Sequence, residues 1–366
     1  METTKNSDVR INNRKRVLNT LFREGGMTKH ELAVKLEISP PTITLLLKEL
    51  MDRGLISKGE VLGSTGGRKP ISMTPVYDLK YSIGIEISSH EIRLVLVDLG
   101  ANVLHQERYP YGIQESKEYW GKVSEILDEF ILSNKIDDSK LLGIGISLQP
   151  SNGNTGKNKQ EHISHLDMGM IHESFNYHVK IHSSAKMAAI AQIWNLNDRD
   201  NFVFVSLGSY VAGAMVYKNE IIDFDNENGE FGKVLSSVTD SKKISDYCIM
   251  QALCERGGVK DISNFFERIE EPKIKKLWDE YLDVLCTLLY NLYCIFGWKI
   301  VIGGSMSPYL EQYKSNISNK LNELCGNESD ESGYIDISDL GEFGAAVGTA
   351  LLPVDKFLES GFDEID

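Results

Sequence analysis

The sequence predicts an α/β protein in which a small winged helix-turn-helix precedes a larger, two-lobed body. Between residues 13 and 57, two capped helices joined by a tight turn are followed by Gly-Leu-Ile, as in a winged helix. From residue 81 onward strand and helix patterns alternate, and residues 81–100 and 201–217 each contain paired apolar runs. Two lobes that each begin with paired strands indicate an internally duplicated α/β fold.

The helices of the N-terminal segment are expected from their start and stop signals. Residues 13–23 have apolar positions at helical spacing, and Gly25-Gly26 ends that pattern. Thr28 and Glu31 have the spacing of a capping box, which opens a second helix. Ser39 suits the cap of a third helix, with Pro40 at the first helical position, where a missing N–H costs nothing.

The third helix is the expected DNA-contacting element, since such a helix enters a major groove with its N-terminal end leading. Its exposed face is predicted to include Leu45, and the residues expected to contact DNA are Ser39, Pro41, Thr42, Thr44 and Lys48. The threonines suit phosphates or thymine methyl groups, and Lys48 suits a phosphate. The alternative is a protein-docking three-helix module.

Charge is distributed unevenly between the two parts of the chain. Residues 1–70 carry 13 Lys and Arg against 8 Asp and Glu, a net of +5, whereas the remainder carries −19. A basic head on an acidic body is typical of a polyanion-binding module on a body that does not bind polyanions. Glycines and a proline flank Arg68 and Lys69, which are expected at the wing tip, near the DNA backbone or in a minor groove. A plain interdomain linker is the alternative for this stretch.

Four segments are therefore expected along the chain. Residues 1–62 form the winged helix-turn-helix domain, and residues 63–77 form the wing and linker. Residues 78–196 form the first α/β lobe and residues 197–342 the second, while the C-terminal helix, residues 343–366, packs back on the first lobe. The expected helices of the body cover residues 115–133, 185–194, 244–255, 271–296 and 308–324.

Five motifs of the body occur in the order and spacing of a known family. They are residues 81–100, Gly143-Ile144-Gly145-Ile146, residues 202–216, Asn228-Gly229-Glu230-Phe231-Gly232 and Val301-Ile302-Gly303-Gly304. With the winged helix in front of them, the whole chain resembles the ROK family, which contains repressors and sugar kinases. The resemblance implies a two-lobed actin/ribonuclease-H-like (sugar kinase) fold and, from the winged helix, the repressor branch of the family.

Departures from the family pattern argue against kinase activity. Where the kinases carry two glycines in the first phosphate turn, this chain has Ser88-Ser89 after Glu86. The second phosphate turn begins at Gly208 and places the bulky Tyr210 where backbone must approach a phosphate. The catalytic Asn-Asp pair of the kinases corresponds to Ser183-Ser184, and a serine without an activating partner is not a base at neutral pH. We therefore expect no catalytic residue and no cofactor.

The family's zinc site pairs a histidine with a cysteine cluster. Here Lys233 stands at the histidine position, and the cysteine cluster is missing. Zinc needs about four N, S or O ligands and lysine is a cation at neutral pH, so no structural zinc is expected. The five cysteines form no C-x-x-C pair, and their odd number fits scattered free thiols in a reducing compartment.

The sugar pocket of the relatives corresponds, by the same resemblance, to Ser183, Ser184, Glu230, Lys233 and Asp246. Glu230 is able to accept two sugar hydroxyls, and a cationic Lys233 favours an anionic ligand such as a phosphorylated or acidic sugar. The sequence leaves open the alternative that Lys233 merely pairs with Glu230 and that the cleft has lost its effector.

Three functions compete on this evidence. The first is a transcriptional regulator, a repressor of carbohydrate-related genes, which binds a palindromic double-stranded operator as a homodimer or homotetramer and responds to a sugar or sugar-phosphate effector between the lobes. The second is a sugar kinase with an appended head, and the third is an effector-less dimeric DNA-binding regulator. The N-terminus has no apolar signal-peptide core and no apolar run is long enough to span a bilayer, so a cytoplasmic protein without a membrane partner is expected.

Overall fold

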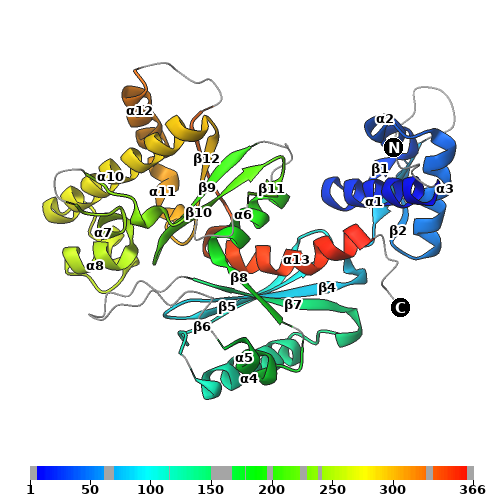
Figure 1. Cartoon of the computed structure of the whole chain (residues 1–366), viewed down its shortest axis with the longest axis horizontal. Coiled ribbons are helices and arrows are strands. Elements are labelled where there is room, and N and C mark those ends of the chain that lie inside the picture. Colours follow the sequence, from blue (N-terminus) through cyan, green and yellow to red (C-terminus); the bar gives the residue numbers. More distant parts are fainter. Residues whose placement is uncertain are drawn as a thin grey trace.

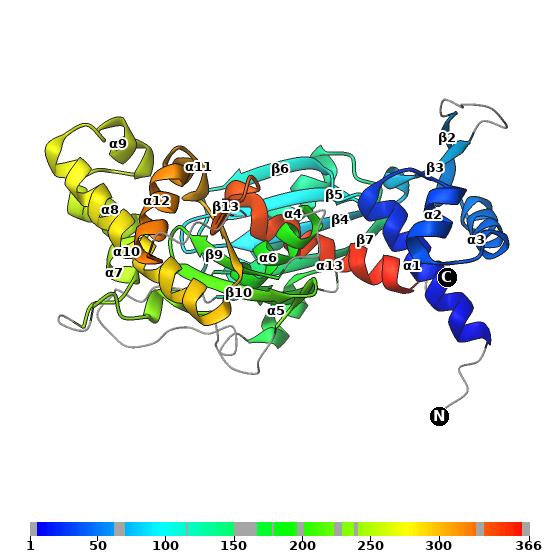
Figure 2. The same cartoon turned by 90° about the horizontal axis from the view of Figure 1, so that it is seen from above.

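The computed structural model describes residues 6–61, 70–114, 116–149, 167–177, 179–195, 201–222, 229–237, 241–326 and 333–360. A small helical head lies at one end of the molecule, and two sheets with their helices form the rest (Figure 1). The last helix runs between the two sheets toward the head, so that the C-terminal end of the described chain lies beside the head (Figures 1 and 2). Among the described residues, no helix is long and apolar enough to cross a bilayer.

The head has the predicted winged helix-turn-helix fold. Its helices are α1 (Asn6–Glu24), α2 (Lys29–Leu36) and α3 (Pro40–Asp52), and its strands are β1 (Met27–Thr28), β2 (Ile56–Val61) and β3 (Ile71–Pro75). The strands form an antiparallel sheet in the order β1-β3-β2. The predicted capping box is confirmed, because the Glu31 N–H donates to Thr28 Oγ1 at 3.2 Å and the Thr28 N–H donates to Glu31 Oε2 at 2.7 Å.

The first lobe is built on a five-stranded sheet in the order β6-β5-β4-β7-β8. Its strands are β4 (Tyr81–Ile87), β5 (Ile92–Asp98), β6 (Val103–Tyr109), β7 (Leu141–Leu148) and β8 (Val179–Ser183). The first three pair antiparallel, while β7 runs parallel to β4 and β8 parallel to β7. Helices α4 (Lys117–Ser133) and α5 (Met168–Ser174) cover the outer face, where the α4 side chains of Tyr119 and Trp120 are fully buried.

The second lobe repeats this topology, with its strands in the order β11-β10-β9-β12-β13. The strands are β9 (Phe202–Leu207), β10 (Val211–Tyr217), β11 (Glu220–Ile221), β12 (Lys299–Gly303) and β13 (Ile335–Ile337). Again the first three strands pair antiparallel, while β12 runs parallel to β9 and β13 parallel to β12. The same order and the same strand directions in both sheets confirm the predicted internal duplication. The long helix α10 (Pro272–Phe296) covers the outer face of this sheet.

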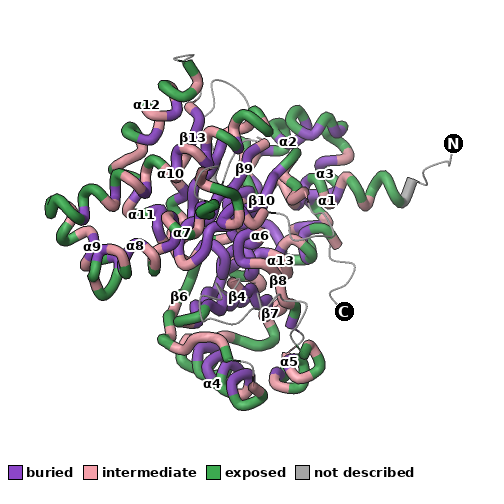
Figure 3. Tube along the Cα trace, turned by 60° about the vertical axis from the view of Figure 1, so that its left-hand side comes forward, coloured by how far each residue is buried: buried purple, intermediate pink, exposed green. Residues whose placement is uncertain are grey.

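Two helices, α6 (Ser184–Asn195) and α13 (Gly344–Ser360), lie between the sheets and pack on each other. α13 also packs on β4, β7 and β5, and α6 contacts β9 and β10 of the second lobe. The approach of α13 to β4 is close, because a Cβ at Gly84 would lie 1.9 Å from the carbonyl oxygen of Ala346. Buried residues accordingly concentrate in the strands and in α6 (Figure 3).

Two of the predicted helices are interrupted. The segment predicted as one helix over 244–255 forms α7 (Ser245–Cys248) and α8 (Met250–Gly257), because Ile249 is extended, with φ −90° and ψ 143°. The break lets the Met250 N–H donate to the Gly208 carbonyl at 2.8 Å, which gives this backbone carbonyl in the loop between β9 and β10 a hydrogen-bond partner. The helix predicted over 308–324 divides into α11 (Ser307–Leu310) and α12 (Lys314–Leu324), with a 3₁₀ turn between them.

Candidate functional site

The outer face of α3 is the candidate DNA-contacting surface. Ser39 caps the helix, since its Oγ accepts the Thr42 N–H at 3.4 Å, and prolines occupy the first turn. The inner face is buried in the core of the head through Ile43, Leu46, Leu47 and Leu50. The opposite face of α3 therefore points to solvent.

Most of the residues predicted to contact DNA lie on this outer face. The exposed ones are Ser39, Pro41, Thr44 and Lys48. Thr42 is half-buried and its hydroxyl lies 2.8 Å from Ser39 Oγ, so this hydroxyl belongs to the helix cap. Leu45 is 52% exposed and adds an apolar group to the face. Arg68 and Lys69 lie outside the described residues.

An ion-pair cluster fixes α3 against α1. Arg10 and Arg14 of α1 pair with the two carboxylate oxygens of Glu49, at 3.0 and 2.8 Å. Burial raises the pKa of Glu49, but hydrogen bonds from the two arginines outweigh this effect, so its pKa lies below the ordinary value. The carboxylate thus stays charged and holds the exposed face of α3 in a defined orientation.

In the first lobe, the turn between β4 and β5 is closed by its own side chain. Ser88 Oγ accepts the backbone N–H groups of His90 and Glu91 at 3.2 and 3.0 Å and donates to the Glu91 carbonyl at 3.0 Å. A glycine-rich phosphate turn offers such N–H groups to a ligand. Here the Ser88 hydroxyl occupies two of them.

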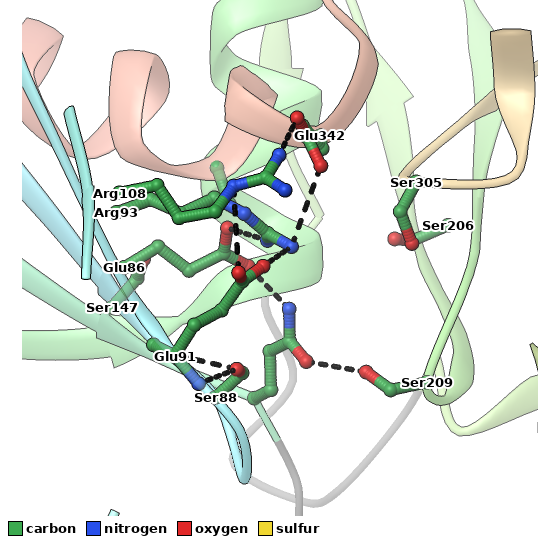
Figure 4. Close-up of polar contacts among 12 residues, drawn as sticks. Glu86, Ser88, Glu91, Arg93, Arg108, Ser147, Ser206, Ser209, Ser305 and Glu342 are labelled. Carbon is green, nitrogen blue, oxygen red and sulfur yellow. Dashed lines mark hydrogen bonds and ion pairs between the residues drawn. The ribbon is translucent and has the colours of Figure 1, made fainter. Parts of the chain in front are cut away.

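Beside this turn lies a cluster of five charged side chains, which we call the Arg93 cluster: Glu86, Glu91, Arg93, Arg108 and Glu342 (Figure 4). Arg93 donates to Glu86 at 3.0 Å and also pairs with Glu91, and its distance to Glu342 is 3.8 Å. Arg108 pairs with Glu342 and lies 3.4 Å from Glu91. Three carboxylates against two guanidinium groups give this cluster a net charge of −1.

A hydrogen-bonded bridge joins the Arg93 cluster to the second lobe. Gln149, after β7, donates from Nε2 to Glu86 at 2.8 Å and accepts the Ser209 hydroxyl at 2.6 Å (Figure 4). The adjoining cavity has an empty volume of about 300 Å³, which includes open solvent, and its walls include Arg93, Glu342 and Ser305. The bridge therefore crosses the cleft between the lobes.

Tyr210 lies in the second turn, between β9 and β10, and lines the cavity in this cleft. Its side chain is 5% exposed, and the Ser206 hydroxyl lies 3.4 Å from its phenol oxygen. Burial raises the pKa of the phenol above its ordinary value, so the group is neutral. The ring packs against Ala185 of α6 and Ala212 of β10, so it occupies space where the second turn meets the first lobe.

The predicted ligand residues come from both lobes. Ser183 ends β8 and is half-buried, and Ser184 begins α6 and is fully buried. Glu230 directly precedes a 3₁₀ turn (Phe231–Lys233) that packs on β10 and α7, and it forms an ion pair of 2.9 Å with Lys233 at the end of that turn. Asp246 is exposed on α7 and accepts the Lys243 N–H at 2.8 Å. The described residues contain no group of three or more His, Cys, Asp or Glu side chains suited to a metal ion.

Sequence reasoning missed the residues around Glu86. The pairing of Glu86 with Arg93 could have been predicted, because the two residues are directly opposed in the β4–β5 hairpin and the register of a hairpin follows from its turn. The contacts of Glu342 and Ser209 had no such local pattern in the sequence, because these residues come from distant parts of the chain.

Comparisons with known proteins agree with this architecture. A family described as winged helix-turn-helix DNA-binding matches residues 12–57, and the ROK family matches residues 82–356. A xylose repressor from Staphylococcus xylosus is 27% identical over 268 residues, which are 67% of each chain. The DNA-binding transcriptional dual regulator NagC from Escherichia coli K12 is 27% identical over 124 residues, 34% of this chain and 30% of that protein. The match thus spans less than a third of that regulator's length.

Solved structures show the same fold at low identity. A ROK family transcriptional regulator, described as a homolog of the E. coli MLC protein, has a TM-score of 0.68 at 16% identity and covers 96% of this chain and 97% of its own. A ROK family glucokinase from Streptomyces griseus, solved with glucose and AMPPNP, has a TM-score of 0.59 at 15% identity, with 74% and 98% covered. At such identities the likeness establishes the fold and not the activity.

Proposed function

The chain belongs to the ROK family, and we propose that within this family it is a DNA-binding transcriptional regulator. In this proposal it acts in the cytoplasm, represses carbohydrate-related genes and responds to a sugar-type effector between the lobes. The observation that carries the proposal is α3, whose inner face is buried in the head while Thr44, Leu45 and Lys48 face solvent. Relatives named as a regulator and a xylose repressor support it.

In this proposal α3 enters the major groove with Ser39 and Pro41 leading. Lys48 then contacts a phosphate, and Thr44 and Leu45 contact base edges. Arg68 and Lys69 contribute the wing contacts. Because few side chains of α3 suit hydrogen bonding to bases, phosphate contacts carry most of the affinity, which therefore falls steeply with salt.

Selection from a random-sequence duplex library by the full chain, followed by fluorescence anisotropy, tests DNA binding. We expect one palindromic sequence to be enriched and to bind about 10³-fold more tightly than a scrambled duplex. A library without enrichment, together with no measurable affinity at low salt, would rule the proposal out.

We propose that the body is not a kinase. By family resemblance, the β4–β5 turn and the Gly208 turn correspond to the phosphate turns of the kinases. Ser88 occupies two N–H groups of the first, the Arg93 cluster beside it carries a net negative charge, and the second contains the buried, bulky side chain of Tyr210. Each feature disfavours a polyphosphate. A coupled phosphorylation assay over a panel of hexoses and pentoses is expected to stay at background, and turnover of any sugar with ATP would favour the kinase alternative.

The proposed effector site includes Ser183, Ser184, Glu230, Lys233 and Asp246. Because Lys233 already pairs with Glu230 at 2.9 Å, an anionic group gains less from this lysine than the sequence alone suggests. We therefore propose a neutral sugar ahead of a phosphorylated or acidic one.

Thermal shift tests the effector. A neutral sugar at about 100 times its Kd stabilises the chain by about 2.7 kcal/mol. Shifts confined to sugar phosphates or sugar acids would replace the neutral ligand with an anionic one. The absence of any shift over a broad panel would favour the effector-less alternative.

We also propose that the functional unit is a homodimer or homotetramer, because a head of this kind reads a two-fold site in two copies. The outer surface of α10 presents Ile295, which is 72% exposed. Sedimentation equilibrium measures the state directly, and a monomer at the concentrations used for DNA binding would contradict this part of the proposal.

A further inference from the structure

The two helices between the sheets, α6 and α13, run side by side in the same direction. A Cβ at Gly344 of α13 would lie 3.8 Å from the Cβ of Ala188 in α6. A Cβ at Gly348 would lie 1.7 Å from the carbonyl oxygen of Met187 and 3.1 Å from the nitrogen of Ala191. Further along, Trp194 of α6 donates from its indole N–H to Asp355 of α13 at 3.2 Å. The contacts of Gly344, Gly348 and Asp355 with Ala188, Ala191 and Trp194, respectively, advance together along both helices, which therefore run parallel and lie in direct backbone contact.

At one end, both helices meet the same residue of the head. Arg23, near the end of α1, donates to Asp355 at 2.7 Å. The Arg23 guanidinium also lies over the Trp194 ring, 4.4 Å from its centroid. Because Trp194 belongs to α6 and Asp355 to α13, Arg23 contacts both interlobe helices at once.

At the other end, both helices begin at the cleft between the lobes. Glu342, directly before α13, belongs to the Arg93 cluster, and Ala185, in the first turn of α6, packs against Tyr210. The Gln149–Ser209 bridge joins the same region to the second lobe. The distance along α13 from Glu342 to Asp355 is about 20 Å at the rise of an α-helix.

Each of the two helices links the two lobes. α13 follows β13 of the second lobe in the chain but packs on β4, β5 and β7 of the first sheet, with glycines at the contact. α6 continues from β8 of the first lobe and contacts β7 and β8 as well as β9 and β10 of the second sheet. When two lobes move about helices packed in this way, the movement appears as a small shear between the helices. A change in lobe closure therefore displaces Trp194 relative to Asp355.

We propose that Arg23 is the positioning residue through which the closure of the lobes sets the orientation of the DNA-binding head. The inference rests on the proposed function and adds the route of regulation. In one lobe arrangement Trp194 and Asp355 together hold Arg23, and in another they separate, so the head turns on the body. Coupling of this kind is reciprocal, so DNA bound by the head must change the cleft.

Amide hydrogen exchange on the full chain, with and without the enriched duplex, tests this coupling. In the wild type, DNA is expected to change exchange in peptides that contain Gly208 and Met250, at the cleft, by about 5-fold or more. In the R23Q variant we expect the change to fall below about 2-fold, although the variant still binds the duplex. D355N keeps an oxygen acceptor for Trp194 but removes the charge that faces Arg23, and should lose the response in the same way.

The matched control is R268Q, which removes an arginine that pairs with Glu271 at 2.8 Å in the second lobe, and it should respond as the wild type does. A wild-type response in R23Q and D355N overturns the inference. So does a wild-type protein that binds the duplex without any change at the cleft. A wild type that binds no duplex contradicts the proposed function instead, and anisotropy detects this before any exchange is measured.

Discussion

The contact between α6 and α13 predicts that adding one methyl group at Gly348 destabilises the protein. Elsewhere in a helix, replacing glycine with alanine is favourable by about 1 kcal/mol, because alanine loses less backbone freedom on folding. Here the new Cβ would lie 1.7 Å from the Met187 carbonyl oxygen and 3.1 Å from the Ala191 nitrogen. Both are backbone atoms, so no side-chain rotation relieves the clash.

The magnitude follows from the displacement that G348A requires. The two helices must separate by about 1.5 Å before the Cβ reaches ordinary contact distance, and overpacking of this kind costs about 1–3 kcal/mol or more. We take the upper part of that range, since the helix backbones are also held by the sheets. After the helix-propensity gain of about 1 kcal/mol, a net loss of about 2 kcal/mol lowers Tm by roughly 4–8 °C.

Thermal unfolding of G348A beside G121A measures this effect. Gly121 lies inside α4, and a Cβ added there would have no other atom within 4 Å, so G121A should raise Tm by about 2–4 °C. Because both variants replace glycine with alanine inside a helix, a lower Tm for G348A and a higher Tm for G121A separate the effect of the helix contact from that of helix propensity. A G348A protein as stable as the wild type would refute the close approach of α6 and α13.

Three further predictions concern the head and the cleft. Hydrogen bonds from Thr28 lower the pKa of Glu31 below its ordinary value of 4.5, so the charged carboxylate stabilises the folded state above that pH. This stabilisation is lost as the pH falls through the pKa of the folded state. Urea unfolding at several pH values should therefore show that the free energy of unfolding depends less on acid in E31Q than in the wild type. Replacing a contacted thymine by uracil should weaken wild-type binding by about 4-fold, or about 0.8 kcal/mol, and leave L45A unchanged, as anisotropy would show. R93M removes the charge that faces the Glu86 carboxylate, which is 2% exposed, and should lower the free energy of unfolding by about 3–5 kcal/mol. Denaturant unfolding should show that the double variant E86Q/R93M recovers most of this loss. A double variant as unstable as R93M would argue against the ion pair.

Much of the head was predictable because its signals are local. The Thr28 capping box and the Ser39 cap with Pro40 lie within four residues of the groups they satisfy. The Thr42 hydroxyl was not assigned to the cap, because sequence spacing does not say which of two nearby hydroxyl groups binds the other. Local chemistry thus predicts the helix but not the orientation of each side chain on it.

The cleft was less predictable because its partners are distant in the chain. Glu342 meets Arg108 across more than 200 residues, and Ser209 meets Gln149 across the two lobes. Strand β6 was also missed, since it is an edge strand with mostly exposed side chains and therefore lacks an apolar alternation. The family resemblance indicated where the phosphate turns lie, but not which side chains now fill them.

The central claim is that this chain recognises DNA through the outer face of α3. The most direct measurement is the affinity of the full chain for the enriched and the scrambled duplex over a range of salt concentrations, for the wild type and K48A. We predict tight binding to the enriched duplex alone. For K48A we predict a log–log salt slope smaller by about two, because each of the two heads on the palindrome loses one phosphate contact. Equal wild-type affinity for both duplexes, or a slope unaffected by K48A, would contradict it.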